Sequence, residues 1–309
     1  MTNSISNPRT LLFVPGNQPA MLKKAAGFEV EWLIPDLEDS VPAAEKVAAR
    51  KVVAEHLPIL AGAGKRLAPR VNGLSSGYFE GDAAAVVSHH IVGISIGKIS
   101  KPKEVRVAEE VLAECEKAAG IPVGHTAILP WLETAEAVIN AYQICRSSDR
   151  IQWAAFGAED FSADMGIRRS VDIDKDKGDS GAGAVIEPGI AYPRSAVAVA
   201  ARAAGVHALD TPYTKFRDPE GLRADAMLAK SIGYKGKLAI HPAQVEVIES
   251  VFMPTETEID RARRVIDAAA KAEAEGRGSV SLDGEMIDMP VILRAQNVLE
   301  DAGLARSND

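Results

Sequence analysis

Eight short apolar runs alternate with longer stretches of helical length along most of the chain, and this alternation is its strongest constraint on fold. Several of the longer stretches begin with Pro or Thr and end at Gly, as helix caps predict. Such a rhythm is typical of βαβ units around a parallel sheet. The runs are Thr10–Val14, Glu31–Pro35, Arg66–Val71, Ile91–Ile96, His125–Pro130, Gln152–Phe156, Val206–Leu209 and Lys237–Ile240.

Eight strand–helix alternations in about 250 residues match the (β/α)8 barrel, also called the TIM barrel. An open doubly wound sheet is the alternative, but it usually carries a Gly-rich phosphate loop after its first strand. Here that position reads FVPGNQP, with Gly16 as its one glycine. The sequence therefore predicts an α/β fold with a TIM barrel over residues 1–250. Residues 251–309 are predicted to form a C-terminal helical extension, and residues 167–187 a long polar loop.

Charge and cysteine usage exclude several function classes. The formal net charge is −8 without any basic block, so we expect no nucleic-acid partner and no anionic membrane surface. No apolar run is long enough to span a bilayer. Cys115 and Cys145 form neither a metal-spaced pair nor a disulfide framework. A cytoplasmic protein is therefore expected.

The ends of the predicted strands carry an unusual set of polar residues. Since the carboxyl ends of barrel strands face one mouth, these side chains are expected to converge there. Carboxylates without a Cys or His cluster suit a hard cation such as Mg2+, and Glu133 and Asp160 are the best candidates. Arg70 either binds an anionic substrate or pairs with Asp36 or Glu38. The strand ends carry Asp36–Asp39, Arg70–Asn72, Lys98, Glu133, Glu159, Asp160, Asp210 and His241.

Eight short motifs occur in register between Arg9 and Val291, and together they resemble one enzyme family. They are RTLLFVPGN, PDLEDSVPAAEK, PRVNG, LETAEAV, FGAEDFSADMG, ALDTPY, KLAIHPAQVEVI and DGEMIDMPV. This order is similar to that of the citrate lyase beta-subunit/malyl-CoA lyase branch of the HpcH/HpaI aldolase family. The resemblance implies a TIM barrel that makes or breaks a carbon–carbon bond in short-chain 3-hydroxyacyl-CoA thioesters with Mg2+, or with Mn2+ in its place.

The resemblance also implies roles for individual residues. Arg70 matches a catalytic arginine that contacts substrate, and Glu38 an acid beside the metal. Glu133 and Asp160 match the two metal carboxylates. Gly157, Ala158, Glu159 and Asp160 match the loop that holds the keto acid. Arg9, Phe13, Pro15 and Gly16 match the elements that border CoA. The family often has Leu-Pro-Lys where this chain has Ile96-Gly97-Lys98, and this difference leaves Lys98 without an assigned role.

Asp288 is the last candidate, and it lies beyond the eighth predicted strand. Asp288 lies between Ile287 and Met289, and its simplest interpretation is an acid at the start of a helix over MPVILRAQNVL. In related lyases the aspartate of a similar arm enters a neighbouring subunit's site. The resemblance therefore implies that Asp288 acts in trans as a general acid–base. It also implies that residues 251–309 pack on a neighbour in a homotrimer or hexamer.

The expected function is a Mg2+-dependent lyase for malyl-CoA, citramalyl-CoA or citryl-CoA. Its products would be acetyl-CoA or propionyl-CoA and a keto acid such as glyoxylate, pyruvate or oxaloacetate. Three enzyme alternatives stay open: a citrate lyase beta subunit that acts on an acyl-carrier-protein thioester, a malyl-CoA thioesterase or malate synthase-like enzyme, and a CoA-independent hydroxy-keto-acid aldolase. A non-catalytic barrel is the alternative from another class.

Overall fold

A computed structural model describes residues 7–169, 187–276 and 280–304. The described chain divides into two compact units, Pro8–Glu249 and the part from Ser250 onward. No helix within these ranges is long and apolar enough to cross a membrane. Most of the loop predicted at 167–187 lies outside the described residues.

The first unit is a closed parallel barrel, which confirms the predicted TIM barrel. Its sheet runs in the order β1-β9-β8-β7-β6-β5-β4-β2-β3 and closes through β1 and β2. Because β3 and β4 both pair with β2 and occupy one strand position, the barrel has eight strand positions. The strands are β1 (Thr10–Pro15), β2 (Trp32–Asp36), β3 (Arg66–Leu67), β4 (Arg70–Val71), β5 (Gly93–Ile96), β6 (Ala127–Leu132), β7 (Trp153–Phe156), β8 (His207–Asp210) and β9 (Gly236–Ala239).

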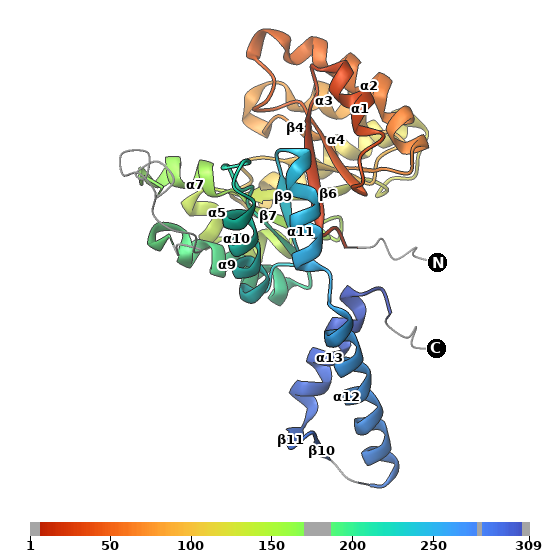
Figure 1. The fold of residues 1–309 in the computed structure, drawn as a ribbon. Helices are drawn as coiled ribbons and strands as arrows, with labels where there is room; N and C mark the ends of the chain where they lie inside the picture. The colour runs from red at the N-terminus through yellow and green to blue at the C-terminus, as the bar shows by residue number, and fades with distance from the viewer. Residues whose placement is uncertain (1–6, 170–186, 277–279, 305–309) are drawn as a thin grey trace. The chain divides into compact units, whose positions relative to one another are not determined.

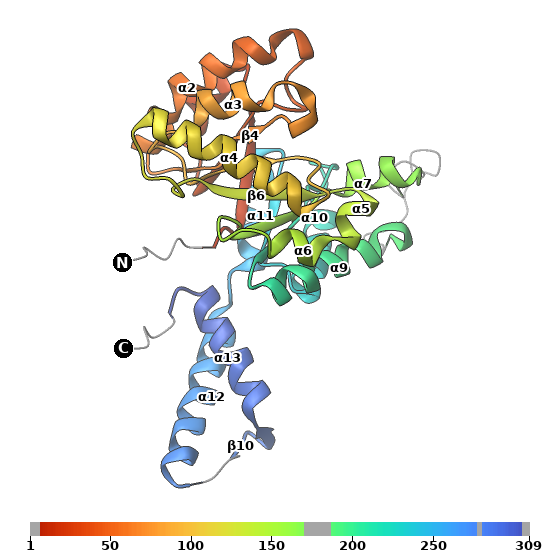
Figure 2. The ribbon, with the colours of Figure 1, turned by 180° about the vertical axis from the view of Figure 1, so that it is seen from behind.

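Helices surround this barrel on the outside (Figures 1 and 2). They bury small and branched residues such as Val53 and Leu112 against the strands, which are themselves almost fully buried. The helices are α1 (Pro19–Ala25), α2 (Lys46–Gly62), α3 (Phe79–Val86), α4 (Pro102–Ala119), α5 (Ala135–Ile139), α6 (Ala141–Cys145), α7 (Ala158–Met165), α9 (Pro188–Ala204), α10 (Pro219–Ile232) and α11 (Val245–Phe252). Short 3-10 turns cover Ala43–Glu45, Leu74–Ser76 and Pro242–Gln244.

Three local predictions are wrong. The predicted strand Arg66–Val71 is two pieces, because Pro69 in the gap has no N–H to donate. The stretch TAEAVINAYQICR, which the alternating pattern predicts as one helix, forms two helices that meet at Asn140, and the side-chain amide of Asn140 donates to the Ser100 carbonyl. Residues Ala158–Asp160 form the first turn of α7, although they were interpreted only as the end of a strand.

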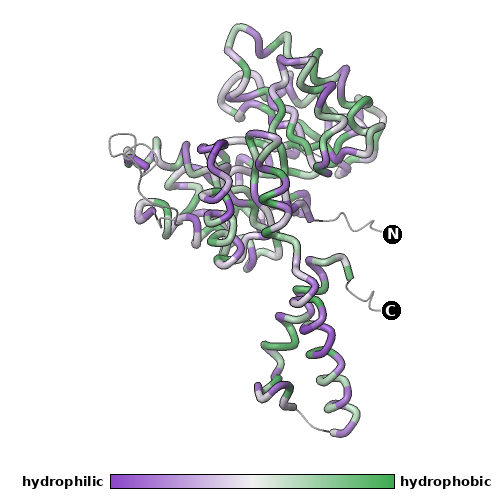
Figure 3. The backbone as a smooth tube through the Cα atoms, in the orientation of Figure 1, coloured by the Kyte–Doolittle hydropathy of each residue, from purple (hydrophilic) through white to green (hydrophobic). Residues whose placement is uncertain are grey.

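The C-terminal unit is a helical hairpin with a small antiparallel ribbon. It contains α12 (Glu256–Ala274), β10 (Val280–Leu282), β11 (Glu285–Ile287) and α13 (Met289–Asp301). Hydrophobic and hydrophilic residues alternate along α12 (Figure 3), as an amphipathic helix requires. Val265 and Ala262 of α12 pack with Ile287 and Ala295 in a core of its own. The predicted C-terminal helical extension is therefore present.

Candidate active site

A cavity of about 390 Å³ opens where the carboxyl ends of the barrel strands meet, and we call it the mouth cavity. Such a mouth is where TIM barrels carry their chemistry. Eight residues that the sequence predicted for the site line it: Phe13, Pro15, Arg70, Glu133, Gly157, Ala158, Glu159 and Asp160. The other lining residues are Asp36, Asp39, Ser40, Trp131, Thr211, Pro212, Thr214 and Ile240.

Arg70 lies in the cavity wall and is held by three carboxylates. It faces Asp36 in the β2–β4 register, and its Nε and Nη2 donate to the two Asp36 oxygens at 2.7 Å each. Its Nη1 lies 3.0 Å from Asp39 and 3.2 Å from Glu38. Asp36 also accepts the backbone N–H groups of Glu38 and Ser40. Burial raises the pKa of Asp36, but the Arg70 guanidinium outweighs it and holds that pKa below its ordinary value.

Two aromatic rings cover Arg70. Its guanidinium carbon lies 4.7 Å from the centre of the Phe13 ring and 5.9 Å from that of Trp131. The Trp131 indole is itself fixed, because its N–H donates to the Ser95 hydroxyl at 2.6 Å. This packing fixes the orientation of the guanidinium and excludes water from its aromatic side. With less water nearby, its positive charge interacts more strongly with a bound anionic group.

Glu133 follows β6 and is only 3% exposed. Its Oε1 accepts the Lys98 backbone N–H at 2.7 Å. Gly157 comes so close to Glu133 that a Cβ there would lie 2.3 Å from Oε2. On the other side, a Cβ on Gly97 would lie 3.1 Å from Oε1 and 2.9 Å from an oxygen of Glu38. The two glycines thus make room for closely spaced carboxylates.

Burial raises the pKa of Glu133 to about 8, and the negative charges of Asp160 and Glu38 contribute to the rise. Burial likewise raises the pKa of Glu38 to about 7, although Arg70 opposes the change. For both carboxyl groups the cost of burial and the neighbouring negative charges outweigh the cations nearby. A cation bound beside these carboxyl groups would stabilise their ionised forms and so lower both pKa values.

Lys98 brings a positive charge close to Asp160. Its Nζ lies 3.6 Å from Asp160 Oδ1, and both side chains are partly exposed, by 51% and 38%. Its backbone φ is +60°, a left-handed conformation that is unfavourable for a residue with a Cβ. This strained conformation aims its N–H at Glu133 while its side chain reaches Asp160, so Lys98 connects the two acids.

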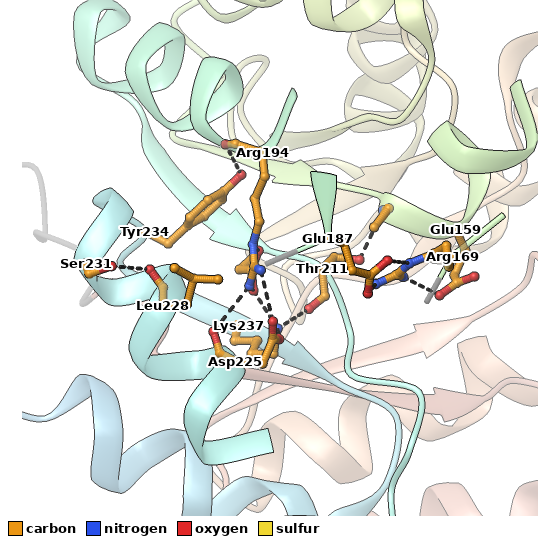
Figure 4. A network of polar contacts seen from close by, with 12 residues as sticks. Glu159, Arg169, Glu187, Arg194, Thr211, Asp225, Leu228, Ser231, Tyr234 and Lys237 are labelled. Carbon is orange, nitrogen blue, oxygen red and sulfur yellow. Dashed lines mark hydrogen bonds and ion pairs between the residues drawn. The ribbon is translucent and has the colours of Figure 1, made fainter. Parts of the chain in front are cut away.

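A buried ion network supports the β7–β8 side of the cavity (Figure 4). Arg194 donates to both oxygens of Asp210, and Lys237 pairs with Asp210 and Asp225. Lys237 also donates to the Thr211 carbonyl at 2.7 Å. The Thr211 hydroxyl in turn accepts the Ala158 N–H at 3.1 Å, at the start of α7. The network therefore fixes the turn that carries Asp160.

The outer end of this turn is fixed separately. Arg169 donates to Glu159 and to both oxygens of Glu187, and Figure 4 shows its guanidinium between the two acids. Glu159 is consequently an ion-pair partner at the cavity edge. Burial lowers the pKa of Arg169, but its two carboxylate partners raise it overall.

Four predicted residues are not among those that line the mouth cavity. Glu38 contacts Arg70 and lines a neighbouring cavity of about 360 Å³ with Lys46, Asn72 and Lys98. Gly16 lies behind the wall, where its N–H donates to the Asp36 carbonyl.

Arg9 precedes β1, at the opposite end of that strand from Phe13, and pairs with Glu249. Asp288 belongs to the C-terminal unit, where its carboxylate caps α13 by accepting the Val291 N–H.

Sequence reasoning missed Trp131, Thr211 and the position of Lys98. Thr211 lies in a motif that was recognised, ALDTPY, and Trp131 comes directly before another, LETAEAV, but neither was selected as a site residue. Proximity of Lys98 to Asp160 depends on its positive φ, which nothing in the local sequence predicts.

Several known proteins are similar to this chain. The family model HpcH/HpaI aldolase/citrate lyase matches residues 9–242. "Citrate lyase subunit beta" of Leuconostoc mesenteroides subsp. cremoris is 37% identical, over 97% of this chain and 94% of that protein. "L-malyl-CoA/beta-methylmalyl-CoA lyase" of Rhodobacter capsulatus is 29% identical, over 96% and 95%. Protein CitE from Mycobacterium tuberculosis, solved with magnesium, acetoacetate and coenzyme A, is 26% identical with a TM-score of 0.73, covering 96% of this chain and 98% of that one.

Proposed function

Because the chain belongs to the HpcH/HpaI aldolase/citrate lyase family, we propose that it is a Mg2+-dependent carbon–carbon lyase. Its substrate would be a short-chain 3-hydroxyacyl thioester, and its products an acetyl or propionyl thioester and a keto acid. The observation that carries the proposal is the convergence of Arg70, Glu133 and Asp160 on one cavity at the barrel mouth.

Glu133 and Asp160 fit a magnesium ion. Both offer oxygen donors to the mouth cavity, and Glu133 lacks enough positive charge nearby to ionise readily. Within the described residues no three His, Cys, Asp or Glu side chains form a ready-made metal cage. Two carboxylates suit Mg2+, since this ion usually keeps water and substrate as its remaining ligands. When bound, Mg2+ would lower the pKa of the substrate hydroxyl as a Lewis acid.

Arg70 would hold the thioester oxygen. Its Nε and Nη2 are committed to buried Asp36. Its Nη1 lies 3.2 Å from Glu38 and 3.0 Å from Asp39, whose side chain is 57% exposed. A substrate oxygen can therefore replace Asp39 at Nη1 without disturbing the buried pair. Phe13 and Asp36 keep the guanidinium oriented, so little reorganisation is needed as charge develops.

The reaction balances with these groups. The hydroxyl proton passes to water, C3 becomes the carbonyl carbon of the keto acid, and the C2–C3 bond breaks. The electron pair of that bond moves to the thioester as an enolate, whose oxygen faces Arg70. A proton then adds to C2 to give the acyl thioester. The N–H groups at the start of α7, which Thr211 and the buried network hold in place, would border the keto acid.

We assign the proton transfer at C2 to Asp288 of a neighbouring subunit, in a homotrimer or hexamer. The support is its motif, together with its geometry: Asp288 caps α13 through Oδ1, which accepts the Val291 N–H at 3.3 Å. Mixing Asp288→Ala chains with Asp160→Ala chains should restore part of the activity, because some mixed sites hold both acids. A mixture that stays inactive although mixed oligomers form would contradict the assignment.

An activity assay identifies the acyl group of the substrate and the carrier that bears it. The purified chain is assayed with malyl, citramalyl, β-methylmalyl and citryl thioesters of CoA, with separate detection of the keto acid and of free thiol. Keto acid without free thiol supports the lyase. Free thiol without keto acid supports a thioesterase or a malate synthase-like enzyme, and only the second releases free thiol from acetyl-CoA when glyoxylate is supplied and consumed.

A second candidate is a citrate lyase beta subunit that acts on an acyl-carrier-protein thioester, which the 37% identity favours. It predicts no turnover with any CoA thioester and turnover with the carrier-bound citryl group. Turnover of a free hydroxy-keto acid alone would contradict both proposals and support the CoA-independent aldolase.

A further inference from the structure

Lys98 is a charged residue at the barrel mouth that the proposed lyase reaction does not use. Its Nζ lies 3.6 Å from Oδ1 of Asp160, which lines the mouth cavity. Lys98 also lines the neighbouring cavity of about 360 Å³, together with Glu38 and Asp39. Asp39 lines both cavities. The Lys98 side chain therefore shares open space with a second exposed carboxylate, that of Asp39.

The backbone of Lys98 is fixed, whereas its side chain can move. Its N–H donates to Glu133 Oε1 at 2.7 Å. Its side chain is 51% exposed, and its contact with Asp160 is longer than a hydrogen bond. Lys46, which lines the same neighbouring cavity, is instead held by the Glu38 carbonyl at 2.7 Å. Because exposed ion pairs contribute little to stability and the lysine stem is flexible, the Lys98 ammonium group can change its acceptor at small cost.

Asp39 is also loosely held, and its partner is Arg70. Its Oδ2 lies 3.0 Å from Arg70 Nη1, and its side chain is 57% exposed. Glu38 contacts the same nitrogen at 3.2 Å but is only 10% exposed. Since Nη1 carries two hydrogens, Glu38 and one other acceptor can share it. Departure of Asp39 thus frees one N–H of Arg70 and leaves both bonds to Asp36 intact.

The charge of Lys98 links these two loose contacts. Burial lowers the pKa of Lys98, but the negative charges around it, first that of Asp160, raise this pKa overall. The ammonium group is therefore a full positive charge beside an acid that we propose as a metal ligand. A divalent cation at Asp160 repels this ammonium group. Asp39 is the exposed acceptor in the adjoining space.

We propose that Lys98 couples metal binding to thioester binding by moving its ammonium group from Asp160 to Asp39. The Asp39 carboxylate then turns from Arg70 Nη1 to the ammonium group and leaves that nitrogen to the thioester oxygen. The metal ion thereby strengthens thioester binding, and by linkage the thioester strengthens metal binding by the same factor. The inference rests on the metal site and the thioester substrate of the proposed function.

The first test measures Mn2+ binding by calorimetry without any thioester. Lys98→Met keeps an unbranched stem and removes the charge, so Mn2+ no longer has to displace an ammonium group. We expect Lys98→Met to bind Mn2+ about twofold to fivefold more tightly than wild type, as the loss of one exposed ion pair implies. The control is Lys101→Met, which removes an exposed ion pair with Glu136 and should leave Mn2+ affinity unchanged. Equal or weaker Mn2+ binding by Lys98→Met overturns the inference.

The second test measures acetyl-CoA affinity with and without Mn2+. We expect Mn2+ to strengthen acetyl-CoA binding by wild type and by Lys101→Met about fivefold. This factor should fall close to one in Lys98→Met, where nothing draws Asp39 away from Arg70. It should also fall close to one in Asp39→Asn, where Nη1 is free at all times, and the double variant should match the single variants.

The two tests separate this inference from the proposed function. Wild type that shows the coupling but cleaves no thioester supports the role of Lys98 and overturns the lyase. An equal coupling factor in wild type and Lys98→Met overturns the role of Lys98 and leaves the lyase standing. Wild type that binds no Mn2+ overturns both.

Discussion

Replacing Gly157 by alanine tests whether the exact placement of the Glu133 carboxylate matters. The new Cβ would lie 2.3 Å from Glu133 Oε2 and 2.6 Å from Glu133 Cβ. Normal contact needs about 3.5 Å, so one group must retreat by about 1 Å. Glu133 cannot simply swing away, because it is 3% exposed and its other oxygen accepts the Lys98 N–H. Since the φ of Gly157 is −108°, alanine meets no backbone strain, and any effect comes from the clash.

Two magnitudes follow from this geometry. A shift of about 1 Å in a group that positions reactants typically costs ~10²-fold in rate, so kcat/KM of Gly157→Ala should fall by about that factor. The overpacking costs about 1–3 kcal/mol of unfolding free energy, partly offset by about 0.4–1 kcal/mol from the loss of glycine's freedom in the unfolded chain. The melting temperature should therefore fall only slightly.

The matched control is Gly62→Ala at the end of α2. A Cβ there meets nothing within 4 Å. The same chemical change should leave kcat/KM at the wild-type value and leave the melting temperature equal or slightly higher. Steady-state kinetics with the best thioester and thermal unfolding by circular dichroism measure both effects. If Gly157→Ala keeps more than half of the wild-type kcat/KM, the close approach to Glu133 is not part of the chemistry.

Three further variants probe the charges. Asp160→Asn should weaken Mg2+ or Mn2+ binding in calorimetry and abolish turnover, because it removes one of the two anionic ligands that we propose; wild-type activity after exhaustive EDTA treatment would contradict this. Arg70→Lys should reduce turnover by at least tenfold and stability by about 1–3 kcal/mol, since lysine cannot make both bonds to Asp36; near-normal turnover would make Arg70 structural. Glu116→Gln should cost roughly 3 kcal/mol at pH 7, as Glu116 is fully buried against Arg150. Burial raises the pKa of Glu116, but Arg150 and two backbone N–H groups lower it overall from 4.5 to about 2, so the stabilisation is complete above pH 4.5 and disappears as pH falls toward 2; a wild-type advantage that persists at pH 2 would refute the assignment.

The barrel could be predicted because hydrophobic alternation reports burial directly. Strands such as β5, β6 and β7 are buried along their whole length, so their apolar runs stand out against the amphipathic helices. Helix α3 did not stand out, because eight residues form a stable helix only through packing. Its Phe79, Ala83 and Val86 are fully buried, but that contact involves residues distant in sequence.

The candidate site could be predicted only as a set of residue types. Position at strand ends, together with the family resemblance, selected Arg70, Glu133 and Asp160. The pairing of Arg70 with Asp36 depends on the register between β2 and β4, which local sequence does not encode. Lys98 follows a glycine, yet Lys98 rather than Gly97 adopts the positive φ. Proximity of its ammonium group to Asp160 is therefore a property of the folded barrel alone.

The charged residues that line the mouth cavity are of two kinds: a buried ion pair that is fixed in place, and exposed carboxylates whose contacts a ligand can replace. Asp36 is 1% exposed and, with Arg70, forms a pair whose two bonds and aromatic cover leave no alternative geometry. Asp39 and Asp160 are 57% and 38% exposed, and each contacts a cation by a single longer contact, of 3.0 and 3.6 Å. Exposed single contacts contribute little to stability, so a ligand can replace them at small cost. Orientation therefore comes from the buried pair, whereas substrate and metal would exchange at the two exposed carboxylates.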